Sequence, residues 1–204
     1  MMRFVLRWVP RLLIVAGLAA VVVASGSMVK EKVGRMRMAS TFNSGGRIAG
    51  DSKAKYTLVE FADYECPPCR DSFSGADELL KKHPKLLNFR FYQFPITAIH
   101  PNAMKASLIS SRIKDPLVWL TVHRRFMTGK LDWKTDAEIC RELKISVADL
   151  LPESDAKKKV KDDMAIAESS GIDSTPTYFL CDQSQVLMKV TSFESVDSYL
   201  QSQE

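Results

Sequence analysis

Two cysteines three positions apart, at a point where a strand gives way to a helix, constrain this chain more than any other feature. The β-branched and aromatic residues at 56–62 predict a buried strand, and 63–65 form a short connection. The motif Cys-Pro-Pro-Cys at 66–69 follows, with both prolines in the first helical turn, where a missing N–H costs nothing. Apolar residues then recur at helical spacing over 70–83. The sequence therefore predicts strand, thiol and helix in that order.

The chemistry of thiols explains why such a motif belongs at the start of a helix. Only a thiolate attacks a disulfide, and the positive end of the helix dipole, with its free N–H groups, lowers the pKa of a thiol placed there. We expect Cys66 to be the attacking sulfur. Cys69 lies one turn further into the helix, and we expect it to resolve the mixed disulfide that Cys66 forms. The pattern favours a redox role.

Two thiols also have other uses. Zinc usually takes four ligands, and there is no second C-x-x-C motif, while His83, His100 and His123 are scattered. A structural disulfide is a further alternative, although closing so short a loop gains little chain entropy. Soft sulfur would also suit Cu(I), but nothing else in the sequence supports copper. We predict no metal and no cofactor.

The surrounding residues resemble DsbA-like thiol-disulfide oxidoreductases, a branch of the thioredoxin superfamily. The resemblance begins with RIAGD at 47–51 and VEFADYECPPC at 59–69. FYQFP at 91–95 and HPNA at 100–103 resemble the second strand and the start of an inserted helical domain, and GIDSTPTYF at 171–179 resembles the cis-proline segment. The order is the one that the family requires, and the match extends from about residue 47 to the C-terminus.

This resemblance implies an α/β thioredoxin fold over 47–204, with an α-helical insertion at about 101–170. Residue patterns agree, because about 70 residues of helical character separate the motif from the cis-proline segment. The helices expected in the insertion cover 103–114, 116–128, 136–143, 147–151 and 155–170. Two strands, 177–181 and 186–191, and a closing helix, 196–201, are expected to follow.

The resemblance also assigns roles around the thiols. Pro176 would be the cis-proline and lie beside the two cysteines, and Thr175 would offer its backbone to an incoming peptide. The exposed start of the helix adds Pro67 and Pro68 to the predicted substrate contacts. An ordinary trans proline at the start of a strand remains the alternative for Pro176.

Glu60 lies six residues before Cys66, where the family has a buried acid that handles the proton of the resolving thiol. An unpaired glutamate is costly to bury in an apolar strand, so its presence there needs a reason. The alternative is an exposed position near a strand end. The two prolines between the cysteines offer neither an imidazole nor an N–H to a thiolate. We therefore predict a couple less oxidising than DsbA itself.

Charge concentrates at the N-terminus. The chain carries +5, but residues 1–37 hold +6 and the remainder −1, so no nucleic-acid-binding face is predicted. Three arginines precede an apolar run at 12–24, which predicts a signal peptide or signal anchor over 1–29, followed by a linker over 30–46. Export to a bacterial periplasm, or anchoring by a single pass at the extracytoplasmic face of the inner membrane, is expected, because disulfides persist there.

The sequence thus predicts an enzyme that forms, reduces or isomerises disulfides in cysteine-containing exported proteins. Such an enzyme needs a membrane redox partner, either an oxidant or a reductant, to restore its thiols. The alternative is a non-catalytic thioredoxin-fold chaperone or assembly factor whose disulfide is structural. Cys140 and Cys181 are expected to be buried free thiols or to bridge each other.

Overall fold

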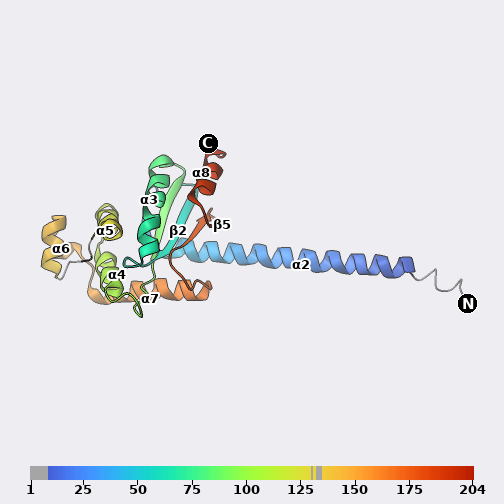
Figure 1. The fold of residues 1–204 in the computed structure, drawn as a ribbon, viewed down its shortest axis with the longest axis horizontal. Coiled ribbons are helices and arrows are strands. Elements are labelled where there is room, and N and C mark those ends of the chain that lie inside the picture. Colours follow the sequence, from blue (N-terminus) through green and yellow to red (C-terminus); the bar gives the residue numbers. More distant parts are fainter. Residues whose placement is uncertain (1–8, 130, 132–134) are drawn as a thin grey trace, which may run out of the picture.

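A five-stranded mixed sheet forms the centre of the molecule (Figure 1). The computed structural model describes residues 9–129, 131 and 135–204. In spatial order, β1-β3-β2-β4-β5, strands β2 and β3 run parallel and the other neighbouring pairs antiparallel. The strands are β1 (Arg47–Ala49), β2 (Tyr56–Ala62), β3 (Leu87–Gln93), β4 (Thr177–Cys181) and β5 (Val186–Val190). All seven residues of the central strand β2 are buried, as expected for a strand covered on both faces.

Helices cover both faces of this sheet. The helices are α2 (Val9–Ser44), α3 (Pro67–Lys82), α4 (Ala103–Arg112), α5 (Pro116–Thr128), α6 (Asp136–Leu143), α7 (Glu153–Ser169) and α8 (Phe193–Gln201), with a short 3-10 turn, η1 (Val147–Asp149). Apolar residues of α3 and α8 share one core cluster with Leu58 of β2. The C-terminal part of α2 and α7 share another with Val59 and Phe61. The predicted α/β order, with a helical insertion between β3 and β4, is confirmed.

Some element ends differ from the sequence-based expectation. The second long strand begins at Leu87, four residues before the expected start, because its first residue pairs in register with Tyr56 of β2. The last helix begins at Phe193 rather than at residue 196, since the Ser192 side chain accepts a hydrogen bond from the Ser195 amide. A short strand, β1, pairs with β3 and was not expected as a strand.

The segment predicted as a linker, 30–46, is instead helical as far as Ser44. The reason is apolar packing, because Ala39 and Phe42 are fully buried. The ring centroid of Phe42 lies 5.2 Å from that of Phe61. The folded unit therefore includes the end of α2.

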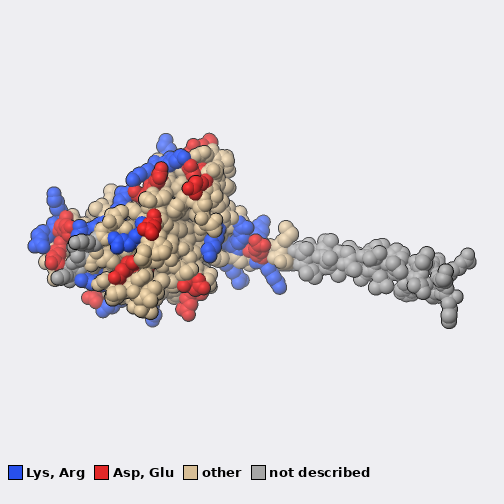
Figure 2. Space-filling model, in the orientation of Figure 1, with Lys and Arg blue, Asp and Glu red and all other residues tan. Residues whose placement is uncertain are grey.

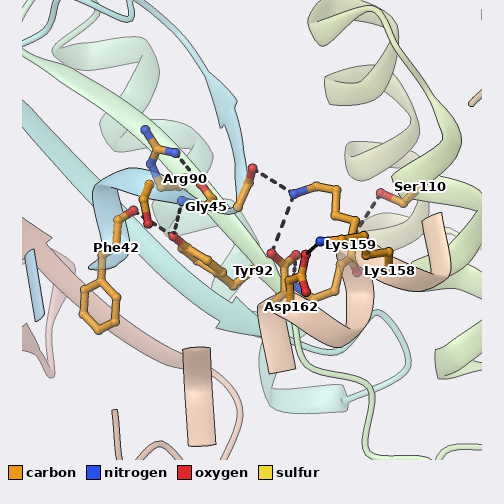
Figure 3. A network of polar contacts seen from close by, with 12 residues as sticks. Phe42, Gly45, Arg90, Tyr92, Ser110, Lys158, Lys159 and Asp162 are labelled. Atoms are coloured by element: carbon orange, nitrogen blue, oxygen red, sulfur yellow. Dashed lines mark hydrogen bonds and ion pairs between the residues drawn. The ribbon is translucent and has the colours of Figure 1, made fainter. Parts of the chain in front are cut away.

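Polar contacts also fix the end of α2 against the sheet (Figure 3). The Tyr92 hydroxyl donates a hydrogen bond to the Phe42 carbonyl at 2.8 Å, and a guanidinium nitrogen of Arg90 donates to the Gly45 carbonyl. From α7, Lys159 donates to the Gly46 carbonyl at 3.0 Å. Gly46 has a φ of 67°, and a Cβ there would lie 2.9 Å from the Phe91 carbonyl oxygen. Glycine thus allows the sharp turn from α2 into β1.

The N-terminal part of α2 extends away from the sheet (Figure 1). Residues 1–8 of the predicted signal peptide or anchor lie outside the described residues, and residues 9–29 are part of α2. Within the described part of the chain, no helix combines the length and apolar character needed to cross a membrane. On the face shown in Figure 2, acidic and basic side chains are interspersed over the folded part.

A buried histidine gives the core a specific acid sensitivity. His123 of α5 is fully buried against the sheet, with its ring centroid 4.6 Å from that of Phe91, and burial lowers its pKa to about 3. In the unfolded chain His123 is protonated below about pH 6.5, whereas in the folded state it stays neutral down to about pH 3. The free energy of unfolding should therefore decrease as the pH falls from 6.5 to 3. We expect His123→Phe to reduce the loss between pH 7 and 4 by about 2–3 kcal/mol. Urea unfolding of both proteins at the two pH values measures this, and equal losses would contradict it.

Candidate functional site

The two thiols lie at the start of α3, as predicted. Cys66 precedes the first helical residue in an extended conformation, and Pro67 and Pro68 begin the helix with exposed side chains. The Arg70 amide donates to the Cys66 carbonyl at 3.2 Å, which closes the first turn. Cys66 is 5% exposed and Cys69 is fully buried, and both are free thiols. Cys66 is therefore the more accessible sulfur.

The loop before β4 lies directly beside this pair. The Thr175–Pro176 peptide bond is cis, which confirms the predicted geometry of Pro176. The Cys66 thiol donates to the Thr175 carbonyl at 3.6 Å, although 109 positions separate these residues in the sequence. The backbone of Thr175 thus lies directly beside the Cys66 sulfur.

The environment of Cys69 opposes its ionisation. Burial is the main cause of its strongly raised pKa, and a hydrogen bond with the Asp63 backbone partly offsets that effect. The neighbouring charge of Glu60 raises the pKa further. A thiol in this setting needs a nearby proton acceptor before it can attack a disulfide.

Glu60, on the neighbouring strand β2, is completely buried. The Tyr178 hydroxyl donates to one of its carboxyl oxygens, Oε1, at 2.6 Å, while Oε2 has no hydrogen-bond partner among the described residues. Burial raises the pKa of Glu60 to about 8, and the bond from Tyr178 acts in the opposite direction. The carboxyl group can therefore gain and lose a proton near neutral pH.

Sequence reasoning missed the hydroxyl groups that continue from Glu60. Tyr178 also lies 3.0 Å, hydroxyl to hydroxyl, from Ser72 of α3, and Ser72 donates to the Cys69 carbonyl at 3.0 Å. Ser72 is half-buried. Because Tyr178 lies opposite Glu60 in the antiparallel register of β2 and β4, only that register reveals the pairing. The three side chains connect the buried carboxyl group to the surface of α3.

A second missed feature fixes the connection before the thiols. The buried carboxylate of Asp63 accepts hydrogen bonds from the Ile96 amide at 2.7 Å and from His100 Nδ1 at 2.8 Å. The Glu65 carboxylate accepts from the Asn102 amide at 2.6 Å. These bonds hold the residues before Cys66 against the segment that leads into α4.

The remaining cysteines belong to separate elements. Cys140 lies in α6 and Cys181 in β4, and both are buried free thiols. Burial raises the pKa of Cys181 to about 12, which keeps it in the unreactive thiol form at neutral pH. The structure thus brings together Cys66, Cys69 and Thr175 but leaves these two cysteines unbridged.

The thioredoxin family model matches residues 43–201 of this chain. Among curated proteins, the chain is 26% identical over 149 residues to Na(+)/H(+) antiporter NhaA 1 of Mycobacterium sp. (strain KMS). That match takes in 65% of this chain and 23% of the antiporter. The chain therefore spans less than a quarter of the length of that relative.

Solved structures share the fold at low sequence identity. One is the thiol-disulfide exchange protein alpha-DsbA2 from Wolbachia pipientis, with a TM-score of 0.64, 15% identity, and coverage of 89% of this chain and 98% of that one. Another is a periplasmic thioredoxin-like protein from Salmonella enterica serovar Typhimurium, with a TM-score of 0.61, 16% identity, and coverage of 81% and 94%.

Proposed function

The chain belongs to the thioredoxin family, with the helical insertion of its DsbA-like members, and from this we propose that Cys66 and Cys69 exchange disulfides with other polypeptides. One observation carries the proposal. The more exposed thiol of the pair, at the start of α3, lies 3.6 Å from the Thr175 carbonyl, and a second, fully buried thiol follows one turn later. This arrangement offers an attacking sulfur, a resolving sulfur and a backbone group for a bound chain.

The exchange has two steps. In the reducing direction, the Cys66 thiolate attacks one sulfur of a substrate disulfide, and the other sulfur leaves as a thiolate that takes up a proton. The Cys69 thiolate then attacks Cys66 and displaces the substrate sulfur. Two electrons pass to the substrate, and the protein keeps a Cys66–Cys69 disulfide. The oxidising direction reverses both steps.

We propose that Glu60 accepts the proton of Cys69 in the second step. With a pKa of about 8, its carboxyl group is mainly protonated at neutral pH and increasingly ionised above it. The resolving step should therefore accelerate as pH rises towards 8. Tyr178 and Ser72 provide the hydroxyl groups through which that proton could reach the surface.

Replacing Tyr178 with phenylalanine tests this path. Since the Tyr178 hydroxyl stabilises the ionised carboxylate, its loss should raise the pH midpoint of the resolving step by about one unit. The measurement is the release of a preformed Cys66–peptide mixed disulfide against pH. Ser72→Ala should slow release without moving the midpoint as far. An unchanged profile in Tyr178→Phe would remove Tyr178 from the mechanism.

We further propose that the protein acts outside the cytoplasm, in the periplasm or at the outer face of the inner membrane. The arginines and apolar run at the N-terminus support export, and a periplasmic thioredoxin-like protein shares the fold. Its substrates would be exported proteins that contain cysteine. A membrane-bound oxidant or reductant would return the Cys66–Cys69 pair to its starting state.

A single-turnover reaction tests the proposed function. The reduced full-length chain is mixed with a peptide disulfide, and alkylation followed by mass spectrometry locates the thiols that remain. We expect loss of one peptide disulfide for each Cys66–Cys69 disulfide formed. Suppression of aggregation without any thiol exchange would instead support the chaperone alternative.

A further inference from the structure

An apolar groove of about 890 Å³ is lined by residues of α4, of α7 and of the segment 171–173 that leads to the cis-proline. Helices α4 and α7, which pack against each other, form its sides. The apolar residues that line it are Phe94, Met104, Leu108, Val160, Met164 and Ile172. This volume is in the range of pockets that bind ligands through several apolar groups.

Two segments that line the groove connect through the backbone to the elements that hold the thiols and the cis-proline. The Phe94 amide donates to the carbonyl of Ala62, the last residue of β2 before the motif, at 2.9 Å. At the other side the lining ends at Asp173, two residues before Thr175. The groove lining thus ends two residues before Thr175, whose carbonyl contacts the Cys66 thiol.

The lining suits a variable apolar partner. Met104, Leu108 and Met164 are half-buried, so their side chains remain accessible from the groove. Methionine is flexible and polarizable and adapts to differently shaped apolar side chains. Such a surface favours many apolar sequences over one small molecule.

Opposite charges mark the two ends of the groove. Lys157 and Lys161 line it near the start of α7, and Glu168 and Asp173 line it near the cis-proline loop. Among the described residues, Lys161, Glu168 and Asp173 have no ion pair. From Lys161 to Glu168 the helix rises about 10 Å, which an extended chain covers in about three residues.

We infer that this groove binds the stretch of substrate polypeptide next to the reacting cysteine. The inference rests on the proposed function. The preferred stretch has a basic residue beside the cysteine, facing Glu168 and Asp173, then apolar residues in the groove. An acidic residue about three positions after the basic one faces Lys161. The protein would thus select substrates by the side chains next to their reacting cysteine, in addition to the disulfide itself.

Matched peptides test this inference with the full-length, reduced protein. Each peptide is palindromic, so its direction in the groove does not matter, and its central cysteine carries a chromogenic thionitrobenzoate in a disulfide. The Cys66 thiolate attacks the peptide sulfur, the peptide–thionitrobenzoate S–S bond breaks, and the coloured thiolate leaves. Cys69 then displaces the peptide thiol. The protein dithiol is oxidised and the probe disulfide is reduced.

The reference peptide has lysine on each side of the cysteine, then two leucines, then a terminal aspartate on each arm. One control replaces every leucine with serine, and another exchanges lysine and aspartate. We expect the reference peptide to react at least about tenfold faster than either control at limiting concentration. Hydroxyethyl disulfide, which has no side chains, reports the intrinsic reactivity of Cys66.

Variants assign the preference to the groove. Lys161→Glu, at an exposed position, should remove most of the advantage of the reference peptide over the charge-exchanged one. Met164→Lys should remove its advantage over the serine peptide. Lys105→Glu is the matched control, because Lys105 is exposed on α4 and does not line the groove. All three variants should react normally with hydroxyethyl disulfide.

Three results would each overturn either substrate docking in the groove or the proposed disulfide exchange, and each result identifies the claim that fails. Equal rates for all peptides, with normal hydroxyethyl disulfide reactivity, would refute docking in the groove and leave the proposed function intact. Self-association of the native protein that is absent in Met164→Lys, with equal rates for all peptides, would refute peptide docking and assign the groove to a second copy of this chain. No reaction of the native protein with hydroxyethyl disulfide would refute the proposed function.

Discussion

Replacing Cys66 with serine should slow disulfide exchange at least about a thousandfold, because the attacking sulfur is lost. A serine hydroxyl is hardly ionised near neutral pH and does not form a disulfide. The remaining thiols should not substitute for it, because Cys69 and Cys181 are fully buried and Cys140 lies within α6 rather than at a helix start beside the Thr175 carbonyl. The measurement is the single-turnover rate of the reduced chain with a small disulfide, followed by thiol alkylation.

The matched variant is Cys69→Ser, which keeps the attacking thiol. We expect it to react with the disulfide but to stop at a mixed disulfide on Cys66, since the resolving sulfur is absent. Intact-mass analysis should then find the added substrate thiol on Cys66. Equal rates for the native protein and Cys66→Ser would contradict the assignment and support a structural role for the pair.

Replacing Glu60 with glutamine should produce the second large effect, on stability. The pKa of Glu60 is raised from 4.5 to about 8 in the folded state, so the unfolded chain ionises first as pH rises. Native stability should consequently fall between pH 4.5 and 8 and stay low above that range. Glu60→Gln should remove this loss, so that at pH 9 the variant is more stable by about 3–5 kcal/mol.

The same variant should resolve mixed disulfides more slowly, because glutamine accepts no proton from Cys69. Urea unfolding at pH 4 and pH 9 measures the first effect, and release of a Cys66–peptide mixed disulfide measures the second. Glu78→Gln, at an exposed position on α3, is the matched control and should change neither. If Glu60→Gln is more stable at pH 9 but releases the peptide at the native rate, burial of Glu60 destabilises the fold and Glu60 does not transfer the proton of Cys69.

Much of the site could be predicted, partly from local residue patterns and partly from the resemblance to DsbA-like proteins. The strand 56–62 has the expected bounds, and the helix follows Cys66 as the prolines indicate. The Thr175–Pro176 bond is cis, the Thr175 carbonyl lies close to the Cys66 sulfur, and Glu60 is fully buried. Local residue patterns predicted the strand and the helix, whereas the cis-proline and the buried glutamate were expected from the resemblance to DsbA-like proteins.

What the sequence did not predict depends on contacts between distant segments. The partnership of Tyr178 with Glu60 follows from the register of β4 on β2, which no local pattern specifies. The bond from His100 to Asp63 likewise joins separate segments. The segment 30–46 was predicted as a linker, but it is helical as far as Ser44 because Phe42 packs against Phe61 and Phe179 of the sheet. The sequence around Phe42 does not specify which distant residues it contacts.

The reduction potential of the Cys66–Cys69 pair tests the central claim most directly. The full-length protein is equilibrated with thiol–disulfide buffers, the thiols are trapped by alkylation, and the oxidised fraction is measured by mass spectrometry. We predict a reversible two-electron transition between about −270 and −120 mV, the span from thioredoxin to DsbA. A pair that stays oxidised throughout that range would contradict the account and identify a structural disulfide.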